Sequence, residues 1–244
     1  MEYQLFLLAS GFVRFSSRFV FFLLVLSGLL ISNAANAQTS YWAVSADIGT
    51  SLQKAKDDTL TRQGLLLPSY GASLAFGKVL SQGLDLKVGL GYRSRGGVTK
   101  VDAVISANDE TTLGSYKIRS RDHFLTNDLS FQFNSSYWRV LDLLPFASLG
   151  LRNDLYLFSN TKTISKDSYF KPEESGQTWH RNRHYRPFVV GLVGTIGVRL
   201  EEDWRVGLEY YHQIFGSYQI PALVRANYSQ LLTRSLQVSV TYRF

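Results

Sequence analysis

The 244-residue chain contains no cysteine and only 5 prolines, and charged residues make up just 18% of it. Without cysteine it cannot form a disulfide scaffold, nor carry a lipid on a cysteine next to a leader cleavage site. Hydrophobic residues account for 45% of the chain, which is too apolar for a disordered protein. Long apolar runs are also scarce, since the one clear run lies at the front. A bundle of membrane helices is therefore excluded.

That single apolar run has the pattern of a secretory signal peptide. It covers Phe19–Ile31, follows two arginines, and precedes a short stretch in which Ala35 and Ala37 stand before Gln38. A positive segment, a short apolar stretch and small residues are the features that a signal peptidase recognises. We therefore expect residues 1–37 to be a signal peptide cleaved between Ala37 and Gln38, with an uncleaved membrane anchor as the alternative.

The expected mature domain, residues 38–244, is basic. Cleavage removes two of the 26 basic and one of the 19 acidic residues, which leaves 24 against 18, or a net charge of +6. An exported protein does not meet nucleic acid in its compartment, so the charge favours an anionic surface as partner.

Apolar and polar residues alternate, with varying clarity, in eight segments of this domain. Such alternation predicts strands whose two faces meet different environments. For the fourth and fifth segments, the pattern also allows a register that is shifted by one residue. The segments are 42–49, 70–77, 84–93, 128–133, 147–155, 188–199, 204–211 and 235–244.

The connections between these segments alternate between long and short. Transmembrane barrels show this asymmetry, because their periplasmic turns are tight and their extracellular loops are long. We therefore predict an all-β fold, an eight-stranded antiparallel up-and-down transmembrane β-barrel, with a soluble β-sandwich as the alternative. The expected long loops are 51–67, 95–121, 158–185 and 214–234, and the short ones are 80–83, 134–144 and 200–203.

The polar faces of the predicted strands carry charges of both signs in nearly equal number. An eight-stranded barrel is just wide enough to be filled by side chains, so a balanced set predicts salt bridges that plug the lumen. Aromatic residues near the strand ends (Trp42, Tyr70, Tyr92, Trp204, Tyr210 and Tyr242) are candidates for two interfacial girdles. The charged residues expected inside are Lys87, Arg93, Arg152, Arg199, Arg205 and Arg243 against Asp47, Asp85, Asp128, Asp154 and Glu209.

The end of the chain carries a family resemblance. Its last residues, Val240-Thr241-Tyr242-Arg243-Phe244, resemble the C-terminal assembly signal of outer-membrane β-barrels. Residues 186–211 are similar to the last hairpin of the PorT-like outer-membrane β-barrel family. The resemblance implies the outer membrane of a Gram-negative bacterium, and recognition of Val240, Tyr242 and Phe244 by the barrel-assembly machinery. A component of a secretion machine is a further candidate partner, and the resemblance does not identify which one.

Candidate chemistry is sparse, and we expect no catalytic residue, cofactor or metal. His180 and His184 have the spacing of a metal-binding pair, but they stand in a basic polar segment without a near carboxylate. His212 with Ser217 would be the pair for a barrel enzyme that acts on lipid A. We favour a polar interfacial role for His212, because a predicted loop separates the two residues.

The predicted extracellular loops are rich in lysine and arginine. The third holds Lys162, Lys166, Arg181 and Arg183, which are candidate contacts for the phosphates of lipopolysaccharide. We therefore expect a non-enzymatic outer-membrane barrel with a structural, surface-interaction or secretion-accessory role, and a narrow pore is the alternative. The second loop adds Arg95, Lys100, Lys117, Arg119 and Arg121.

Overall fold

A computed structural model describes residues 40–56, 61–107, 110–135, 143–165, 188–200, 203–214 and 230–244. The predicted signal peptide and its cleavage residues Ala35, Ala37 and Gln38 lie outside these residues. Within the described ranges, no helix is long and apolar enough to cross a membrane.

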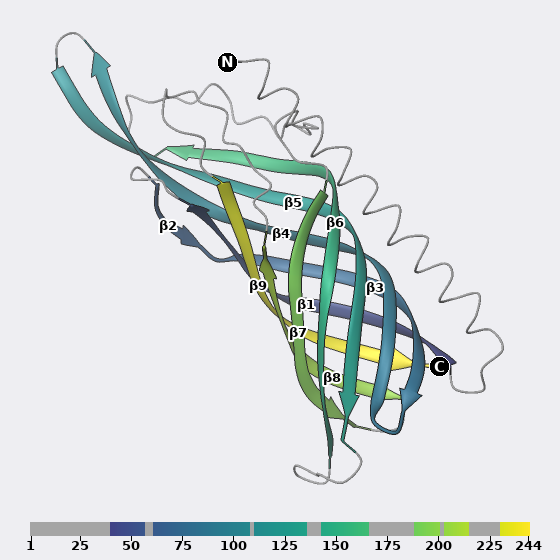
Figure 1. The fold of residues 1–244 in the computed structure, drawn as a ribbon. Helices are drawn as coiled ribbons and strands as arrows, with labels where there is room; N and C mark the ends of the chain where they lie inside the picture. The colour runs from purple at the N-terminus through teal and green to yellow at the C-terminus, as the bar shows by residue number, and fades with distance from the viewer. Residues whose placement is uncertain are drawn as a thin grey trace.

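The described chain folds into antiparallel strands that close on themselves (Figure 1). β1 pairs with β3, each strand from β3 to β8 pairs with the next one along the chain, and the pairing of β1 with β9 completes the ring. β2 follows the line of β3 beyond Leu66 and pairs with β4, so the nine segments form eight barrel strands. The predicted eight-stranded antiparallel barrel is confirmed. The segments are β1 (Ser40–Lys56), β2 (Thr61–Leu65), β3 (Leu67–Ser81), β4 (Leu84–Ala107), β5 (Glu110–Asn134), β6 (Leu144–Ser165), β7 (Phe188–Arg199), β8 (Trp204–Gln213) and β9 (Gln230–Arg243).

Closure joins the first and last strands, as the sequence predicts. β1 and β9 are paired from Ala43 opposite Arg243 to Lys56 opposite Gln230. Two further backbone hydrogen bonds, of 3.0 and 2.9 Å, join Trp42 to Phe244 beyond that register. An unpaired strand edge in a bilayer would leave each backbone group unsatisfied at a cost of several kcal/mol. The β1–β9 pairing removes that edge.

The two ends of the barrel differ in the length of their connections. At one end, which we name the short-turn end, a tight turn at residues 82–83 joins β3 to β4. Gly83 has a φ of 95° there, a conformation that favours glycine. The opposite end, which we name the long-strand end, carries β4 and β5 far past the other strands (Figure 1). The pairing of these two strands continues up to Ala107 opposite Glu110.

The long-strand end corrects the predicted loops. Residues 51–56, 61–65, 95–107, 110–121, 158–165 and 230–234 are strand rather than loop. Outside a bilayer, neither face of a strand has to be apolar, so the alternating pattern fades while backbone pairing continues. The β-branched residues of 98–105 fit that extended conformation.

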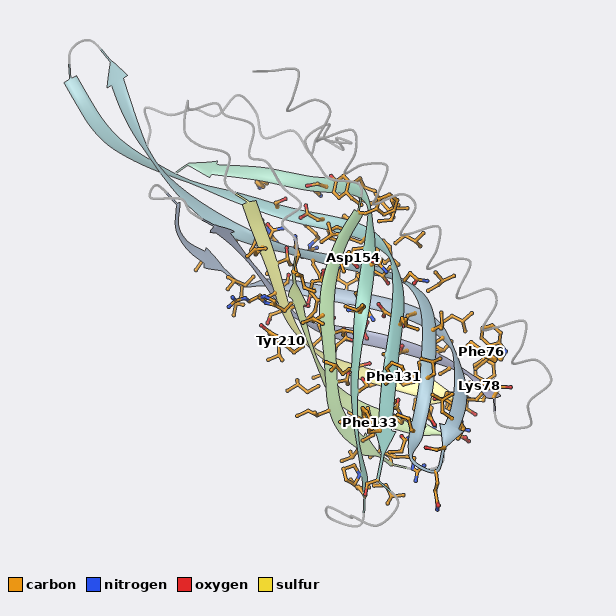
Figure 2. All side chains as sticks on the ribbon, viewed as in Figure 1. Phe76, Lys78, Phe131, Phe133, Asp154 and Tyr210 are labelled. Carbon is orange, nitrogen blue, oxygen red and sulfur yellow. The ribbon has the colours of Figure 1, made fainter. Side chains whose placement is uncertain are left out.

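The outer surface of the barrel is apolar. Leu and Val side chains of all eight barrel strands are exposed there, and Phe131 and Phe133 of β5 show the pattern in Figure 2. The exposed positions confirm the registers of the fourth and fifth predicted strands. A surface of this kind suits lipid, so the soluble sandwich is wrong.

Aromatic pairs lie at both margins of this apolar surface. At the short-turn end, the ring centres of Trp42 and Phe76 lie 5.2 Å apart, and those of Trp204 and Tyr242 lie 4.9 Å apart. Toward the long-strand end, Tyr210 stacks on His212 at 6.4 Å. Amphipathic rings prefer membrane interfaces, so the pairs fit the predicted girdles.

Candidate functional site

The lumen holds the charged side chains that strand alternation placed inside. Successive side chains of a strand point to opposite faces, so an apolar outer surface sends the polar residues inward. Lys87, Asp128, Arg199 and Arg243 are half-buried. Seven others are buried: Asp47, Asp85, Arg93, Arg152, Asp154, Arg205 and Glu209.

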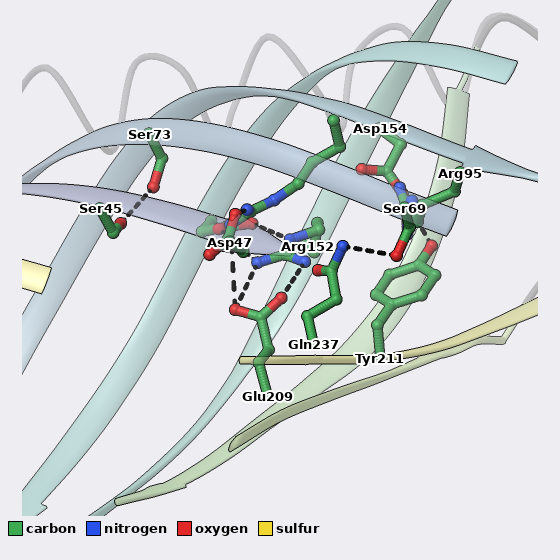
Figure 3. A network of polar contacts seen from close by, with 12 residues as sticks. Ser45, Asp47, Ser69, Ser73, Arg95, Arg152, Asp154, Glu209, Tyr211 and Gln237 are labelled. Atoms are coloured by element: carbon green, nitrogen blue, oxygen red, sulfur yellow. Dashed lines mark hydrogen bonds and ion pairs between the residues drawn. The ribbon is translucent and has the colours of Figure 1, made fainter. Parts of the chain in front are cut away.

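Arg152 of β6 organises the middle of the lumen (Figure 3). Its Nε and Nη2 donate to both carboxylate oxygens of Asp128, at 2.6 and 2.8 Å. Its Nη1 and Nη2 donate to both oxygens of Glu209, at 2.7 and 3.1 Å. Paired hydrogen bonds between a guanidinium and a carboxylate are among the strongest in proteins. Arg152 thus cross-links β5, β6 and β8 inside the barrel.

Arg93 of β4 extends this network to the opposite wall. It forms an ion pair with Asp47 of β1, and its Nη2 lies 3.9 Å from Oε2 of Glu209. Gly71 makes room for it, because a Cβ at that position would collide with the Arg93 side chain. The middle of the lumen is therefore spanned by charged groups from five strands.

A second layer lies nearer the long-strand end and contains a residue that sequence reasoning misplaced. Arg95 forms an ion pair with Asp154, and Tyr211 donates to Asp154 at 2.7 Å. The Arg95 guanidinium lies 3.9 Å from the ring centre of Tyr211 and 4.9 Å from that of Phe124. Arg95 is thus an interior residue and not part of an extracellular loop. β4 continues past Arg93, and every second residue keeps its inward direction.

A third layer occupies the short-turn end. Tyr41 and Asn134 donate to Asp85 at 2.8 and 3.1 Å, and Lys87 donates to Gln132 at 3.2 Å. Tyr41, Asn134 and Gln132 are uncharged, so a search for opposite charges on the predicted polar faces does not find them. Their register is the signal that could have found them, because each lies on the inward face of its strand.

A cavity of about 70 Å³ lies between the middle layer and this third layer. Lys87, Arg93, Arg152 and Arg205 line it together with Asp128 and Glu209. Serine and threonine hydroxyls from several strands complete the wall. Ion pairs thus span the middle of the lumen, and a small polar cavity lies below them.

A different arrangement of charge occurs outside the lumen, at the long-strand end. Arg119 of β5 stands directly opposite Lys162 of β6, and both side chains are exposed. One step further along, Lys117 pairs in register with Lys100 of β4, which pairs in turn with Arg62 of β2. Directly opposed residues share a face of a sheet, as do residues two apart on one strand. These positions therefore all lie on one face.

Arg121 belongs to the same face, two residues from Arg119. Its guanidinium carbon lies 5.8 Å from the ring centre of Tyr70, an exposed residue of the apolar outer surface. The face is therefore continuous with the lipid-facing side of the barrel. Asp102 is an acid on it, opposite Ser115. We call this surface the basic sheet face, defined by the positions of Arg62, Lys100, Lys117, Arg119, Arg121 and Lys162.

The remaining predicted residues are spread over the molecule. Of the candidate lipopolysaccharide contacts, Lys162 is exposed, whereas Lys166, Arg181 and Arg183 lie outside the described residues. His180, His184 and Ser217 lie outside them as well. Among the residues that the structure describes, no group of three or more histidines and acids is placed to hold a metal ion.

The lipid-facing predictions have clearer positions. His212 is half-buried on the outer side, opposite Leu192 and Arg234, and so stands apart from the charged lumen. Val240, Tyr242 and Phe244, the predicted assembly signal, are 39%, 38% and 63% exposed on the outer side of β9. In the folded barrel, these three side chains lie on the lipid-facing side.

Several solved barrels resemble this chain at low sequence identity. Neisserial surface protein A is 10% identical, with 83% of this chain and 97% of that chain covered and a TM-score of 0.40. The outer membrane protein OprG from Pseudomonas aeruginosa is 12% identical, with 84% and 96% covered and a TM-score of 0.41. Ail, the attachment invasion locus protein of Yersinia pestis, is 10% identical, with 85% and 100% covered and a TM-score of 0.32. With TM-scores below 0.5, these resemblances carry no functional conclusion.

The sequence itself gives a stronger match to a family. No curated protein matches the chain. Residues 35–219, however, match the outer membrane protein beta-barrel domain, over 185 of the 244 residues. Together with the closed barrel and its apolar outer surface, this match places the protein in the bacterial outer membrane. The chain belongs to the outer membrane protein beta-barrel domain family.

Proposed function

We propose that the protein is a non-conducting, non-enzymatic barrel whose basic sheet face binds the phosphate groups of lipopolysaccharide in the outer leaflet. In outer-membrane barrels the short turns face the periplasm and the long connections face outward. By this rule the short-turn end is periplasmic and the long-strand end is extracellular. The basic sheet face then stands at the level where the outer-leaflet headgroups begin.

The pairing of Arg119 with Lys162 is the observation that carries the proposal. Like charges directly opposite each other on a sheet are destabilising unless an anion lies between or above them. Arginine binds phosphate through its planar fork and lysine binds it as a point charge. The two exposed cations therefore form a ready contact for one phosphate group.

The dimensions of the face fit a lipid headgroup. Arg121, beside Tyr70 at the aromatic margin, is four residues from Lys117, or about 14 Å along an extended strand. The cations therefore begin at the membrane interface and continue outward for roughly one headgroup layer. A free polyanion in the medium would not require this continuity with the lipid-facing surface.

The test is a titration of the refolded protein, in phosphatidylethanolamine nanodiscs, with lipopolysaccharide. The double variant Arg119→Gln, Lys162→Gln should bind about 20- to 30-fold more weakly, at about 1 kcal/mol for each cation near an anionic surface. Lys78→Gln, a change of the same type near the short-turn end, is the control and should bind normally. Equal binding by the wild type and the double variant would overturn the proposal.

A narrow pore is the second candidate, and the cavity of about 70 Å³ is the observation that favours it. The ion pairs of Arg152 and Arg93 lie across the path from that cavity to the long-strand end. We therefore expect no stable single-channel openings in planar bilayers. Sustained openings of defined conductance would favour the pore.

The finer assignments rest on the resemblance alone. Membership of the PorT-like group and a secretion-accessory role are supported by residues 186–211 and by the C-terminal pattern. Purification from native membranes in mild detergent, followed by identification of co-purifying proteins, tests both. Recovery of secretion components would support the accessory role, and recovery of the barrel without them would contradict it.

A further inference from the structure

The cavity in the lumen has more positive than negative charge around it. Among the residues that the structure describes, four cations and two acids line it: Lys87, Arg93, Arg152 and Arg205 against Asp128 and Glu209. Two further acids, Asp47 and Asp85, form ion pairs with Arg93 and Arg205 and are not part of the cavity wall. Arg95 and Asp154 form their own pair nearer the other end.

Arg205 is the cation whose partners are least complete. Its side chain is 2% exposed, and its nearest acid, Asp85, lies 3.9 Å away. Asp85 already accepts hydrogen bonds from Tyr41 and Asn134. Within the part of the chain that the structure describes, none of the three guanidinium nitrogens of Arg205 has a hydrogen-bond partner.

Lys87 lines the same cavity as Arg205, and it also lacks a hydrogen bond to a carboxylate among the described residues. Its Nζ donates to the neutral amide oxygen of Gln132 at 3.2 Å rather than to a carboxylate. Arg152, in contrast, has a carboxylate on each side. Buried N–H groups without an acceptor are costly, so the Arg205 guanidinium, on the same cavity wall as Lys87, marks a place where an anion would be stabilised.

The size and the wall of the cavity define that counter-ion. A volume of about 70 Å³ has room for a small ion with water, since one water needs roughly 10–15 Å³ by this measure. Ser45, Ser73 and Ser130 line the same space. The hydroxyls of Ser45 and Ser73 share one hydrogen bond of 2.7 Å, which leaves one of them, and Ser130, able to donate to an anion. The space has no room for an organic acid with a long chain.

We infer that the lumen contains a binding site for a small inorganic anion of the size of chloride, held between Arg205 and Lys87. The site is independent of the proposed binding of lipopolysaccharide, because it lies inside the barrel at the opposite end. Its role is structural: the anion accepts hydrogen bonds from the Arg205 guanidinium, which has no acceptor among the described residues, and so stabilises the closed barrel.

Thermal unfolding at constant ionic strength tests this site. The folded protein in nanodiscs should unfold about 2 to 4 °C higher in sodium chloride or bromide than in sodium gluconate, whose anion is too large to enter. Lys87→Gln should remove this difference. Lys78→Gln changes the same residue type on the outer side of the same hairpin and should retain it (Figure 2).

If Lys87→Gln does not fold, anomalous diffraction from the wild-type protein tests the site directly. Crystals of the wild-type protein grown in bromide should show an anomalous peak within contact distance of the Arg205 guanidinium. Such a peak supports the site even without the variant. Water in place of bromide, or an equal midpoint of unfolding in chloride and gluconate, would overturn it.

Discussion

The lumen and the basic sheet face are both rich in arginine, yet the charges are arranged in opposite ways. In the lumen Arg152 lies between two carboxylates, and the whole group is buried. On the basic sheet face Arg119 lies opposite another cation, and both are exposed. Burial requires that charge be neutralised within the protein, whereas exposure leaves charge available to an external ion. The first arrangement stabilises the barrel and the second is suited to binding.

The difference between lumen and outer face exists only while the barrel is closed. Loss of closure should therefore reduce the amount of folded protein more than any other change. Deletion of Tyr242–Phe244 removes the Trp204–Tyr242 ring contact and the backbone pairing of Trp42 with Phe244. We expect a large loss of the folded, heat-modifiable species in the outer membrane and an accumulation of unassembled chain in the periplasm. Deletion of Phe244 alone should have the same effect in a milder form.

The control for this deletion is Leu236→Ala, which removes apolar surface from the same strand and leaves its end intact. If Phe244 only covered apolar surface, its loss would cost roughly 1.5 to 3 kcal/mol and the yield would fall slightly. Normal assembly of the untagged protein after deletion of Tyr242–Phe244 would count against the assembly role of these residues.

Removal of one charge from the lumen should have the next largest effect. Glu209→Gln takes a carboxylate from Arg152 and Arg93 at once and leaves buried cations short of a partner. We expect a loss of about 3 kcal/mol in the free energy of unfolding, measured by urea titration in nanodiscs. Asp203→Asn, in the exposed turn before β8, is the control and should change it by less than about 0.5 kcal/mol. A similar loss in the free energy of unfolding for both variants would mean that water, and not ion pairing, compensates the charges of the lumen.

A smaller test compares two neighbouring tyrosines of β8, of which Tyr211 faces the lumen and Tyr210 faces outward. Tyr211→Phe removes the buried hydrogen bond to Asp154 and should cost about 1 kcal/mol in the free energy of unfolding. Tyr210→Phe is its matched control, because the neighbouring residue is exposed on the outer side. We expect almost no change there. Equal effects at both positions would contradict the inward assignment of Tyr211.

The smallest effect is expected at His212, on the outer side of β8. His212→Ala removes the stacking on Tyr210 but no lumen contact, so the barrel should assemble normally. Mass spectrometry of lipid A from cells with and without the variant should give the same acyl pattern. A change in acyl number that depends on His212 would revive the hypothesis of a lipid-modifying enzyme.

Strand alternation predicted the lumen well within the membrane and failed beyond it. Asp128, Arg152 and Glu209 were placed inside because lipid on one face forces a strict two-residue period. The prediction is wrong for Arg95, because its segment has polar residues on both faces and such a pattern predicts a loop. Where water borders both faces, burial no longer imposes a pattern, although β4 and β5 remain paired up to Ala107 and Glu110.

The sequence by itself therefore determined the fold class, the closure of β1 on β9, and the faces of six of the eight membrane-spanning strands, whereas the structure settled the register of the fourth and fifth predicted strands. These follow from local alternation and from the requirement that no strand edge remain open in lipid. Only the tertiary structure decided which cation meets which acid, as when Arg152 meets Glu209 from 57 residues away. It also brought Arg62, Lys100, Lys117, Arg119, Arg121 and Lys162 onto one face. Both results depend on the stagger between paired strands, which is a property of the closed sheet and not of any one strand.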